Sequence, residues 1–325
     1  MYIAEKTLDD VLRAVLSKLL RSKNRIRPTK GSATELTGVL LKITQPRARL
    51  SRSEMKGTLF SCLGELLWYL ARTNDLKLIS YYLPDYKQFS DDGKTVYGGY
   101  GPRLFKMRGH NQIANIIALL KRKSHSRQAV VQLFDASDLA KKHKDIPCTC
   151  TLQFMIRRGR LLMCTYMRSN DAFLGLPHDV FAFTMLQEIV ARSLQVELGT
   201  YNHAVGSLHL YKKHRSNART YVKEGWQPTT PMPPMPAADP WSSIRKVVGA
   251  ERDIRCGRKA AMSNLRLNGY WQDLVRLLQV YRCFKRQDGD EISRLKGKMS
   301  TRLYDPYIDE KKQAIGRKSA KMLRK

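Results

Sequence analysis

The chain has 325 residues, of which 42% are hydrophobic, and carries a formal net charge of +31 at pH 7. It is long enough to bury a sizeable core, but no apolar run approaches the span of a bilayer and the N-terminus lacks a signal-peptide core. Its six cysteines include no CxxC pair, which argues against a disulfide framework and a zinc site. We therefore expect a cytoplasmic protein that binds no membrane and no metal, and whose positive charge suits anionic partners.

Two helices are predicted in the first quarter of the chain. Thr7-Leu8-Asp9-Asp10 is typical of a helix start, and apolar residues then recur at helical spacing up to Leu19. A second helix is predicted over 53–70, and it carries Glu65 among apolar neighbours. Because burying a carboxylate without partners is costly, we expect Glu65 to be functional or well hydrogen-bonded. Further on, Gly98-Gly99-Tyr100-Gly101 is interpreted as a turn, since no Gly-Lys-Ser/Thr sequence follows it.

The middle of the chain predicts strands and one long helix. Strands are expected at 130–134, 149–156 and 161–166, and the last two form a hairpin that turns at Arg158-Gly159. The basic residues around that turn are expected to be solvated. A helix is expected over 180–198, with Gly199 as its stop signal.

A proline-rich stretch precedes a strongly basic C-terminal region. Six of the 13 prolines fall between Gln227 and Pro240, where they favour extended structure. Residues 241–325 carry 22 Lys+Arg against 9 Asp+Glu, with a helix expected around Trp271–Tyr281 and a basic, helical end from about Tyr307. We therefore predict three parts, namely a catalytic domain over 1–226, a linker over 227–240 and a basic helical extension over 241–325.

Chemically active side chains gather between Pro147 and Tyr211. Cys148 is a candidate nucleophile, because a thiolate is the strong soft nucleophile among ordinary side chains and a cation such as Arg168 favours it. The same segment offers a hydroxyl, two carboxylates and a His/Tyr pair, which suit a phosphate, a sugar and a base. The pattern is that of a nucleotide-binding thiol enzyme. These further residues are Ser169, Asp171, Asp179, His209 and Tyr211.

Four motifs in this segment keep a fixed order and spacing. They are Pro147-Cys148, Arg168-Ser169-Asn170-Asp171, Gly175-Leu176-Pro177-His178-Asp179 and Gly206-Ser207-Leu208-His209-Leu210-Tyr211. In this register the chain resembles the thymidylate synthase and deoxycytidylate hydroxymethylase superfamily over roughly its first two-thirds. The resemblance implies an α+β fold, in which a mixed β-sheet packs with helices and meets a partner sheet in a homodimer. It also implies 5,10-methylenetetrahydrofolate as the one-carbon donor.

The resemblance assigns roles at the reacting end of the site. Cys148 attacks C6 of a pyrimidine, and Glu65 organises water and protons around the ring. Asp171 meets the folate pterin, and Gln153 lies near the nucleotide. The sugar is met by His209 and Tyr211, which do not distinguish ribose from deoxyribose.

Phosphate binding is assigned by the same resemblance. Arg168 and Ser169 bind the 5′-phosphate within one chain. Arg127 matches the first of two arginines that reach the partner's phosphate site in a dimer, and the second position is Gln128 here. Lys30 stands where the family places a basic residue in a phosphate loop.

The resemblance makes Asp179 the candidate residue for selecting the base. Thymidylate synthases carry an asparagine at this place and deoxycytidylate hydroxymethylases an aspartate. Uracil shows a C4 carbonyl and an N3–H, which an amide can match, whereas cytosine shows an N4 amino donor and an N3 acceptor. An ionised carboxylate only accepts, so it binds N4–H and is repelled by O4 of uracil. Asp179 therefore predicts CMP or dCMP as substrate, unless it merely caps a helix beginning at Val180.

The reaction product is predicted from a missing residue. No tryptophan lies between Trp68 and Trp226, so the tryptophan that shields the methylene intermediate from water in synthases is absent. We therefore predict a hydroxymethyltransferase. Two alternatives stay open: a methyltransferase on dUMP or dCMP, and a nucleic-acid-binding protein on the same scaffold. The second is motivated by the basic tail, which would cover the active site, dock a protein or contact nucleic acid.

Overall fold

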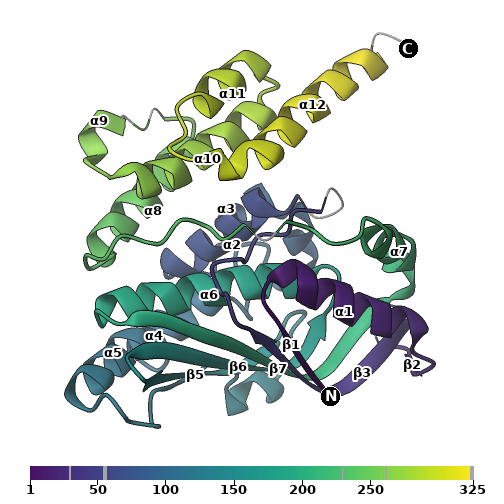
Figure 1. Cartoon of the computed structure of the whole chain (residues 1–325), viewed down its shortest axis with the longest axis vertical. Helices are drawn as coiled ribbons and strands as arrows, with labels where there is room; N and C mark the ends of the chain where they lie inside the picture. The colour runs from purple at the N-terminus through teal and green to yellow at the C-terminus, as the bar shows by residue number, and fades with distance from the viewer. Residues whose placement is uncertain (29–30, 54–56, 229, 259, 261, 323–325) are drawn as a thin grey trace. The chain divides into compact units, whose positions relative to one another are not determined.

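Backbone hydrogen bonds between distant segments form one mixed β-sheet in the N-terminal part of the chain (Figure 1). The computed structural model describes all residues except 29–30, 54–56, 229, 259, 261 and 323–325, so Lys30 lies outside the described residues. The strand order is β1-β3-β7-β6-β5-β4, with β2 beside β3. The β1–β3 and β6–β7 pairs are parallel and the others antiparallel. The strands are β1 (Tyr2–Glu5), β2 (Arg25–Ile26), β3 (Ala33–Ile43), β4 (Val130–Gln132), β5 (Thr149–Arg157), β6 (Arg160–Asp171) and β7 (Glu197–Tyr211).

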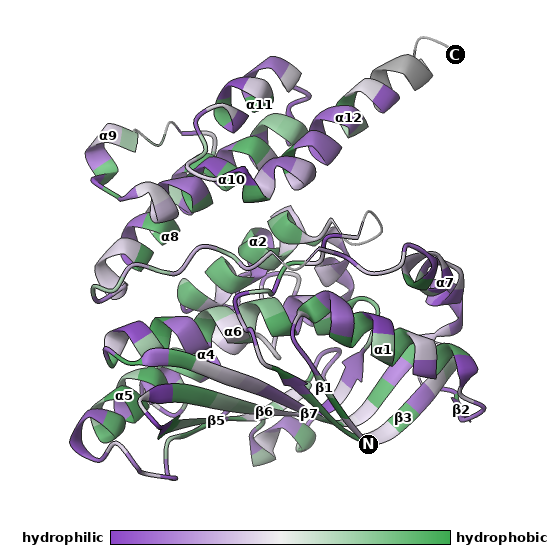
Figure 2. Cartoon of the chain, viewed as in Figure 1, coloured by the Kyte–Doolittle hydropathy of each residue, from purple (hydrophilic) through white to green (hydrophobic). Residues whose placement is uncertain are grey.

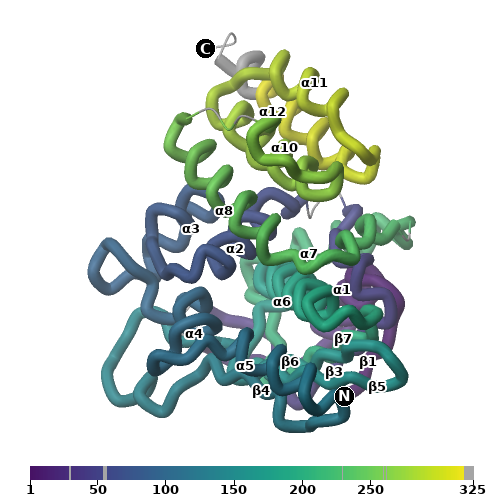
Figure 3. Tube along the Cα trace, turned by 90° about the vertical axis from the view of Figure 1, so that its left-hand side faces the viewer, coloured from purple at the N-terminus to yellow at the C-terminus, as the bar shows by residue number. Residues whose placement is uncertain are grey.

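Helices α1 and α6 pack on one face of this sheet, and α2 packs on α6 (Figures 1 and 3). Most residues of α6 are buried, because the helix lies between β6–β7 and α2. This places α6 at the centre of the core. The helices of this part are α1 (Leu8–Arg21), α2 (Leu59–Leu70), α3 (Leu76–Tyr82), α4 (Tyr100–Lys106), α5 (Gln112–Arg122), α6 (Gly175–Ser193) and α7 (Arg215–Lys223), with 3₁₀ turns η2 (Pro84–Phe89), η3 (Ala136–Leu139) and η4 (Lys212–His214).

Several predicted elements are confirmed. Thr7 is the N-cap of α1 and forms a capping box with Asp10. Arg158 and Gly159 turn between β5 and β6 with φ of +50° and +69°. The second predicted helix is α2, which begins at Leu59. The turn predicted at Gly98-Gly99-Tyr100-Gly101 is only partly right, because Tyr100 and Gly101 already belong to α4. A side chain on Gly101 would collide there with the backbone of Thr73.

The limits predicted for the long helix are wrong at both ends. α6 begins at Gly175, before Asp179, and ends at Ser193, while Gly199 lies within β7. The helix can start early because Pro177 lies in its first turn, where a backbone N–H has no partner within the helix. Asp179 is therefore inside the helix, and the alternative that it only caps a helix at Val180 is wrong.

The opposite face of the sheet carries exposed apolar side chains. Leu40 and Tyr166 both pair with Ala204, so the three side chains form one row across β3, β7 and β6. Leu40 is 37% exposed and Tyr166 46% exposed. Val130, which is 44% exposed, pairs with Gln153 on the same face. Within the described residues, this face therefore presents apolar surface that the chain itself leaves open.

Most of the proline-rich stretch belongs to the sheet-containing unit, which extends to Ala238. The chain divides into two compact units, Met1–Ala238 and Asp239–Lys325. Met232 and Arg47 exchange hydrogen bonds, from Met232 N–H to Arg47 carbonyl (2.8 Å) and from Arg47 Nη1 to Met232 carbonyl (2.9 Å). Met235 donates its N–H to Glu188 Oε1 on α6 at 2.9 Å. The extended proline segment therefore packs on the first unit.

The second unit is helical, as its sequence predicted. α10 packs against α8, α11 and α12, and it contains the most hydrophobic turns of this unit, whereas α12 is largely hydrophilic (Figure 2). None of the described helices is long and apolar enough to cross a membrane. The helices are α8 (Trp241–Arg255), α9 (Met262–Leu265), α10 (Gly269–Lys285), α11 (Gly289–Lys296) and α12 (Asp305–Met322), with the 3₁₀ turn η5 (Arg302–Tyr304).

A buried ion pair ties α6 to the segment after β3. Arg49 Nη2 donates to Glu188 Oε2 at 2.5 Å, and both side chains are almost fully buried. We expect Glu188→Ala to lower the free energy of unfolding by about 3–5 kcal/mol, because it leaves a buried guanidinium without its anion. The matched control Glu197→Ala removes the 74% exposed partner of Arg192 and should cost less than about 1 kcal/mol. Urea unfolding measures both, and equal losses would contradict the assignment.

Candidate active site

Cys148 lies at the end of the loop that leads into β5, beside Arg168 on β6. Arg168 donates from Nε to the Pro147 carbonyl (2.9 Å) and from Nη2 to the Ile146 carbonyl (3.0 Å). Its backbone N–H donates to the Cys148 carbonyl at 2.8 Å. Cys148 itself is half-buried. These bonds hold a guanidinium next to the candidate nucleophile, and positive charge beside a thiol stabilises its thiolate.

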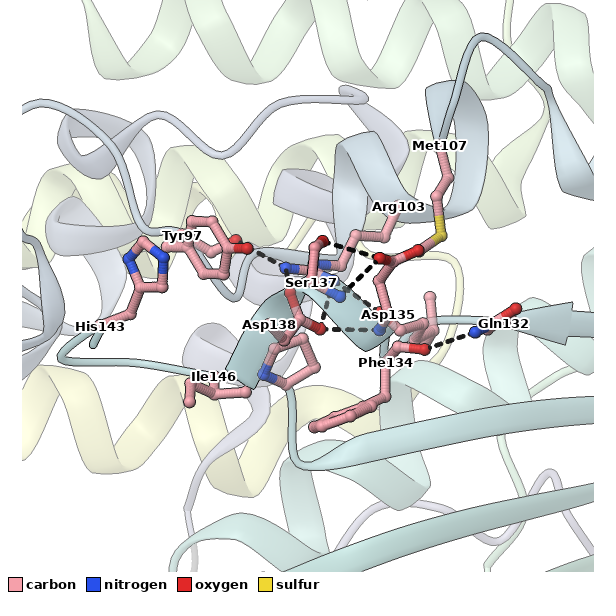
Figure 4. Close-up of polar contacts among 12 residues, drawn as sticks. Tyr97, Arg103, Met107, Gln132, Phe134, Asp135, Ser137, Asp138, His143 and Ile146 are labelled. Atoms are coloured by element: carbon pink, nitrogen blue, oxygen red, sulfur yellow. Dashed lines mark hydrogen bonds and ion pairs between the residues drawn. The ribbon is translucent and has the colours of Figure 1, made fainter. Parts of the chain in front are cut away.

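The loop before the candidate nucleophile is held by a buried ion pair (Figure 4). Arg103 on α4 binds both oxygens of Asp138 at 2.9 and 2.7 Å and the Leu133 carbonyl at 2.8 Å. Nearby, the rings of Tyr97 and His143 stack with centroids 3.5 Å apart. The bidentate geometry fixes both side chains. It therefore holds η3, from which the loop to Cys148 and β5 begins.

Glu65 on α2 is buried and hydrogen-bonded, as its sequence context predicted. Its Oε1 accepts from the hydroxyls of Tyr69 (2.8 Å) and Tyr86 (2.9 Å). Burial, and then the charge of Glu65, raise the pKa of both tyrosines, so both remain donors at neutral pH. Oε2 has no hydrogen bond to any described residue. One oxygen of Glu65 is therefore fixed, and the other is available to a bound molecule.

Asp179 on α6 lies close to Asn170 at the end of β6. Asn170 Nδ2 donates to Asp179 Oδ2 at 2.7 Å, while Oδ1 has no hydrogen bond to the described part of the chain. Burial, and then repulsion from Glu65, raise the pKa of Asp179 to about 8, although the Asn170 bond opposes the shift. The carboxyl is therefore mainly protonated at neutral pH. The substrate prediction that was made from an ionised Asp179 therefore stays a prediction.

His178, beside Asp179, is a cation that the sequence reasoning missed. Its Nδ1 lies 2.9 Å from the Leu174 carbonyl and its Nε2 2.9 Å from Ser61 Oγ. Ser61 already donates its hydroxyl proton to the Thr58 carbonyl, so both ring nitrogens of His178 act as donors. Burial opposes the charge, but other groups outweigh it and raise the pKa of His178 to about 10. Those groups are Cys62, Glu65 and the Leu174 carbonyl.

His209 and Tyr211 meet at the end of β7, with ring centroids 4.9 Å apart. His209 is buried, and its Nδ1 has no partner within the described residues. Burial, and then the charges of Asp171 and Cys148, raise the pKa of Tyr211, so its hydroxyl is near the other site residues. Lys212 and Lys213 follow Tyr211 directly, and sequence reasoning passed over them. A cavity of about 440 Å³ is lined by Gly31, Ser32, Tyr211, Lys212 and Lys213.

Ser169 and Asp171 continue the strand beyond Arg168. Ser169 is half-buried and pairs with Ser207, and Asp171 pairs with His209. Asp171 Oδ1 accepts two backbone N–H groups of the turn that leads into α6, at 2.8 and 3.0 Å. Its Oδ2 has no hydrogen bond to a described residue, so it can accept one from a ligand.

Gln153 and Arg127 lie away from this group. Gln153 pairs with Cys164 and Val130 on the open face of the sheet, and its Nε2 donates to the Arg127 carbonyl at 2.9 Å. Arg127 is exposed. Within one chain, the structure does not bring these two residues to Cys148.

Comparison with known families agrees with this arrangement. Residues 7–247 match the family model of thymidylate synthase. The chain belongs to the thymidylate synthase family. The α+β fold expected from the sequence is confirmed, because the thymidylate synthase of T4 phage superposes with a TM-score of 0.57 at 19% identity, covering 68% of this chain and 85% of that one.

Two phage proteins are similar in sequence. A deoxyuridylate hydroxymethyltransferase of Delftia phage PhiW-14 is 32% identical over 196 residues, which are 56% of this chain and 54% of that protein. One of Pseudomonas phage M6 is 37% identical over 160 residues, 47% of this chain and 45% of that protein. The chain thus spans about half the length of these relatives.

The raised pKa of Asp179 depends on the charge of Glu65. We expect a midpoint near pH 8 when the Asp179 carboxyl is followed by ¹³C NMR, and a lower midpoint in Glu65→Gln, because removing the repelling charge favours ionisation. The control Glu35→Gln changes a carboxylate that hydrogen-bonds Ser207 instead. An Asp179 midpoint near 4 in the unmodified protein would contradict this account.

Proposed function

We propose that this chain is a C5-hydroxymethyltransferase that acts on pyrimidine nucleoside monophosphates with 5,10-methylenetetrahydrofolate. The observation that carries the proposal is the convergence on Tyr100. The Tyr100 hydroxyl accepts the backbone N–H of Thr149, the residue after Cys148, at 3.1 Å. Burial, and then the charges of Cys148 and Asp179, raise the pKa of Tyr100, which supports one site for the three residues. A nucleophile and a base-reading group in one site suit covalent attack on a pyrimidine. The names of the two phage relatives support the same chemistry.

The reaction begins when the Cys148 sulfur bonds to C6, which turns C5 into a carbon nucleophile. Methylenetetrahydrofolate would supply the one-carbon unit that bonds to C5, with loss of the C5 proton and of tetrahydrofolate. Hydroxide then adds to the exocyclic methylene, and the C6–S bond breaks to restore the ring. We assign Glu65 Oε2 to hold the water, because Tyr69 and Tyr86 fix its other oxygen. Asp171 Oδ2 would hold the folate by accepting a hydrogen bond from its pterin, since Oδ1 is already occupied by two backbone N–H groups.

Different residues bind the phosphate and the sugar in this proposal. Arg168 and Ser169 bind the phosphate, and Lys212 and Lys213 add charge at the cavity near Tyr211. His209 and Tyr211 meet the sugar. The same residues allow a methyltransferase, and the two activities differ in whether hydroxide or hydride reaches the methylene. We favour hydroxide, because the shielding tryptophan of synthases is missing and the phage relatives are named hydroxymethyltransferases.

The protonation state of Asp179 decides which base is accepted. With Oδ2 held by Asn170, only Oδ1 faces the base. When protonated, Oδ1–H donates to O4 of uracil or to N3 of cytosine. When ionised, it accepts N4–H of cytosine and repels O4 of uracil. We therefore extend the cytidylate substrates expected from the sequence to uridylate, which is accepted at and below neutral pH.

A homodimer completes the phosphate site in this proposal. The open face of the sheet carries Leu40, Tyr166 and Val130, and burying such apolar surface favours association. Arg127 and Gln153 lie at the same face, so Arg127 can reach the phosphate site of a second copy.

The nucleophile assignment is tested by Cys148→Ser. We expect tritium release from C5 of labelled nucleotide to fall by at least about 10³-fold, since an unactivated hydroxyl cannot replace the thiolate. The matched control Cys256→Ser changes an exposed cysteine of the second unit and should leave the rate unaltered. Retained tritium release in the first variant would exclude the covalent mechanism.

The base assignment is tested by pH profiles of kcat/KM for dUMP and dCMP. For the unmodified protein, we expect kcat/KM for dUMP to fall about tenfold per pH unit above about pH 8. We expect kcat/KM for dCMP to show no such fall. In Asp179→Asn, the amide donates to O4 at every pH, so dUMP turnover should lose this dependence. Parallel profiles for the two nucleotides would contradict the assignment.

A further inference from the structure

The second unit, Asp239–Lys325, lies almost wholly beyond the residues that match the thymidylate synthase family, which end at 247. The proposed reaction uses none of its side chains. Residues 241–325 carry 22 Lys+Arg against 9 Asp+Glu, so like charges repel one another within the unit unless a partner offsets them. Such a surplus of positive charge indicates an anionic partner.

Ion pairs within the second unit involve only part of its positive charge. Most of its acidic side chains are paired with a nearby Lys or Arg, as Glu251–Arg255, Asp253–Arg258, Asp273–Arg276, Glu291–Arg294, Glu310–Lys311, and Lys296 with both Asp305 and Asp309. Another group of cations is exposed and forms no ion pair with a described residue. These are Arg245, Arg252, Arg266, Arg286, Lys298, Arg302, Lys312 and Arg317. The surplus charge therefore lies in side chains that can meet an anion from outside.

Two of these exposed cations, Arg302 and Lys312, line a concavity of about 510 Å³ that is formed by α11, η5 and α12. Two acids, Asp305 and Asp309, line it as well. Both are held by Lys296, whose Nζ lies 3.9 Å from Asp305 Oδ2 and 2.7 Å from Asp309 Oδ2. Three cations against two carboxylates give the concavity a net positive charge, and Arg302 and Lys312 remain available to a ligand.

Thr301 supplies a hydroxyl at the same concavity. Its Oγ1 accepts the Leu303 N–H at 3.2 Å, which fixes the side chain at the start of η5. The hydroxyl proton has no acceptor among the described residues, so it can be donated to a ligand. Two cations and a hydroxyl donor are groups that bind the oxygens of a phosphate.

The surface of the second unit suits a polyanion better than an apolar partner. The large apolar side chains that are exposed in the described chain all belong to the first unit. Protein interfaces are usually anchored by aromatic or other apolar side chains, and helices that lie on membranes bury an apolar face. Interfaces with nucleic acid are instead polar and strongly positive, and phosphate contacts supply nearly all of their sequence-independent affinity. The chemistry therefore favours a polynucleotide.

We propose that the second unit binds the sugar–phosphate backbone of a polynucleotide, with one phosphate held in the concavity by Arg302, Lys312 and Thr301. The other exposed cations of the unit add to the attraction. Contacts to phosphate carry no sequence information, so binding is independent of base sequence. DNA and RNA share this chemistry, and the test separates them. The proposal uses no residue of the active site, so it stands or fails separately from the proposed function.

The test is the fluorescence anisotropy of labelled oligonucleotides of about 20 nucleotides, titrated with the full-length chain at increasing salt. In the double variant Arg302→Gln/Lys312→Gln, we expect the affinity at low salt to fall about tenfold or more. The slope of log K against log[salt] should fall in magnitude by about 2, because two phosphate contacts are lost. The control Arg122→Gln/Lys123→Gln removes two exposed cations at the end of α5, and should change the affinity by less than about twofold. Equal losses in the two double variants would overturn the proposal, since net charge alone would explain them.

Single-stranded DNA, duplex DNA and RNA are measured in parallel. Salt-sensitive binding to any of them supports the proposal, and the preferred one identifies the partner. Absence of binding to all three at low salt overturns it. Equally strong binding to poly-glutamate or to phosphatidylserine vesicles also overturns it, because the unit would then accept any polyanion. Both double variants should keep the unfolding midpoint of the unmodified chain, because the changed side chains are exposed.

Discussion

A half-buried carboxyl on the central helix lies close to a second acid, and this repulsion organises the site. α6 is packed between the sheet and α2, and Asp179 is half-buried on it. Asn170 supplies one donor, while Glu65 on α2 supplies a repelling charge. The balance leaves Asp179 near its midpoint at neutral to mildly basic pH. In the proposed function, a small change in its surroundings therefore changes which base the site accepts.

The two faces of the sheet carry different chemistry because side chains alternate along each strand. On β6, Thr165 faces α6 and pairs with the buried His203, whereas its neighbours Cys164 and Tyr166 face the open side with Gln153. One strand thus faces the core on one side and offers apolar surface on the other. This explains why Gln153 and Arg127, placed near the nucleotide by resemblance, lie away from Cys148 within one chain.

The sequence predicted what depends on local pattern. The capping box at Thr7, the turn at Arg158-Gly159 and the burial of Glu65 all follow from neighbouring residues. It missed the start of α6, because proline in a first turn resembles a helix breaker until the turn's own hydrogen bonds are known. It also missed the buried hydrogen bond between Asn170 and His203. These two residues meet only through the register of β6 and β7, and strand register is set by tertiary packing.

The sequence prediction compares an ionised carboxylate with an amide at residue 179. A protonated carboxyl is a third chemical state that the same aspartate can adopt. It has one donor and one acceptor, as an amide does, and so it can face uracil. The net charge of +31 does not restore the ionised form, because charges beyond about 10 Å are screened while burial and Glu65 act locally. An aspartate here is therefore compatible with the uridylate named for the phage relatives, provided that its surroundings keep the proton on the oxygen that meets the base.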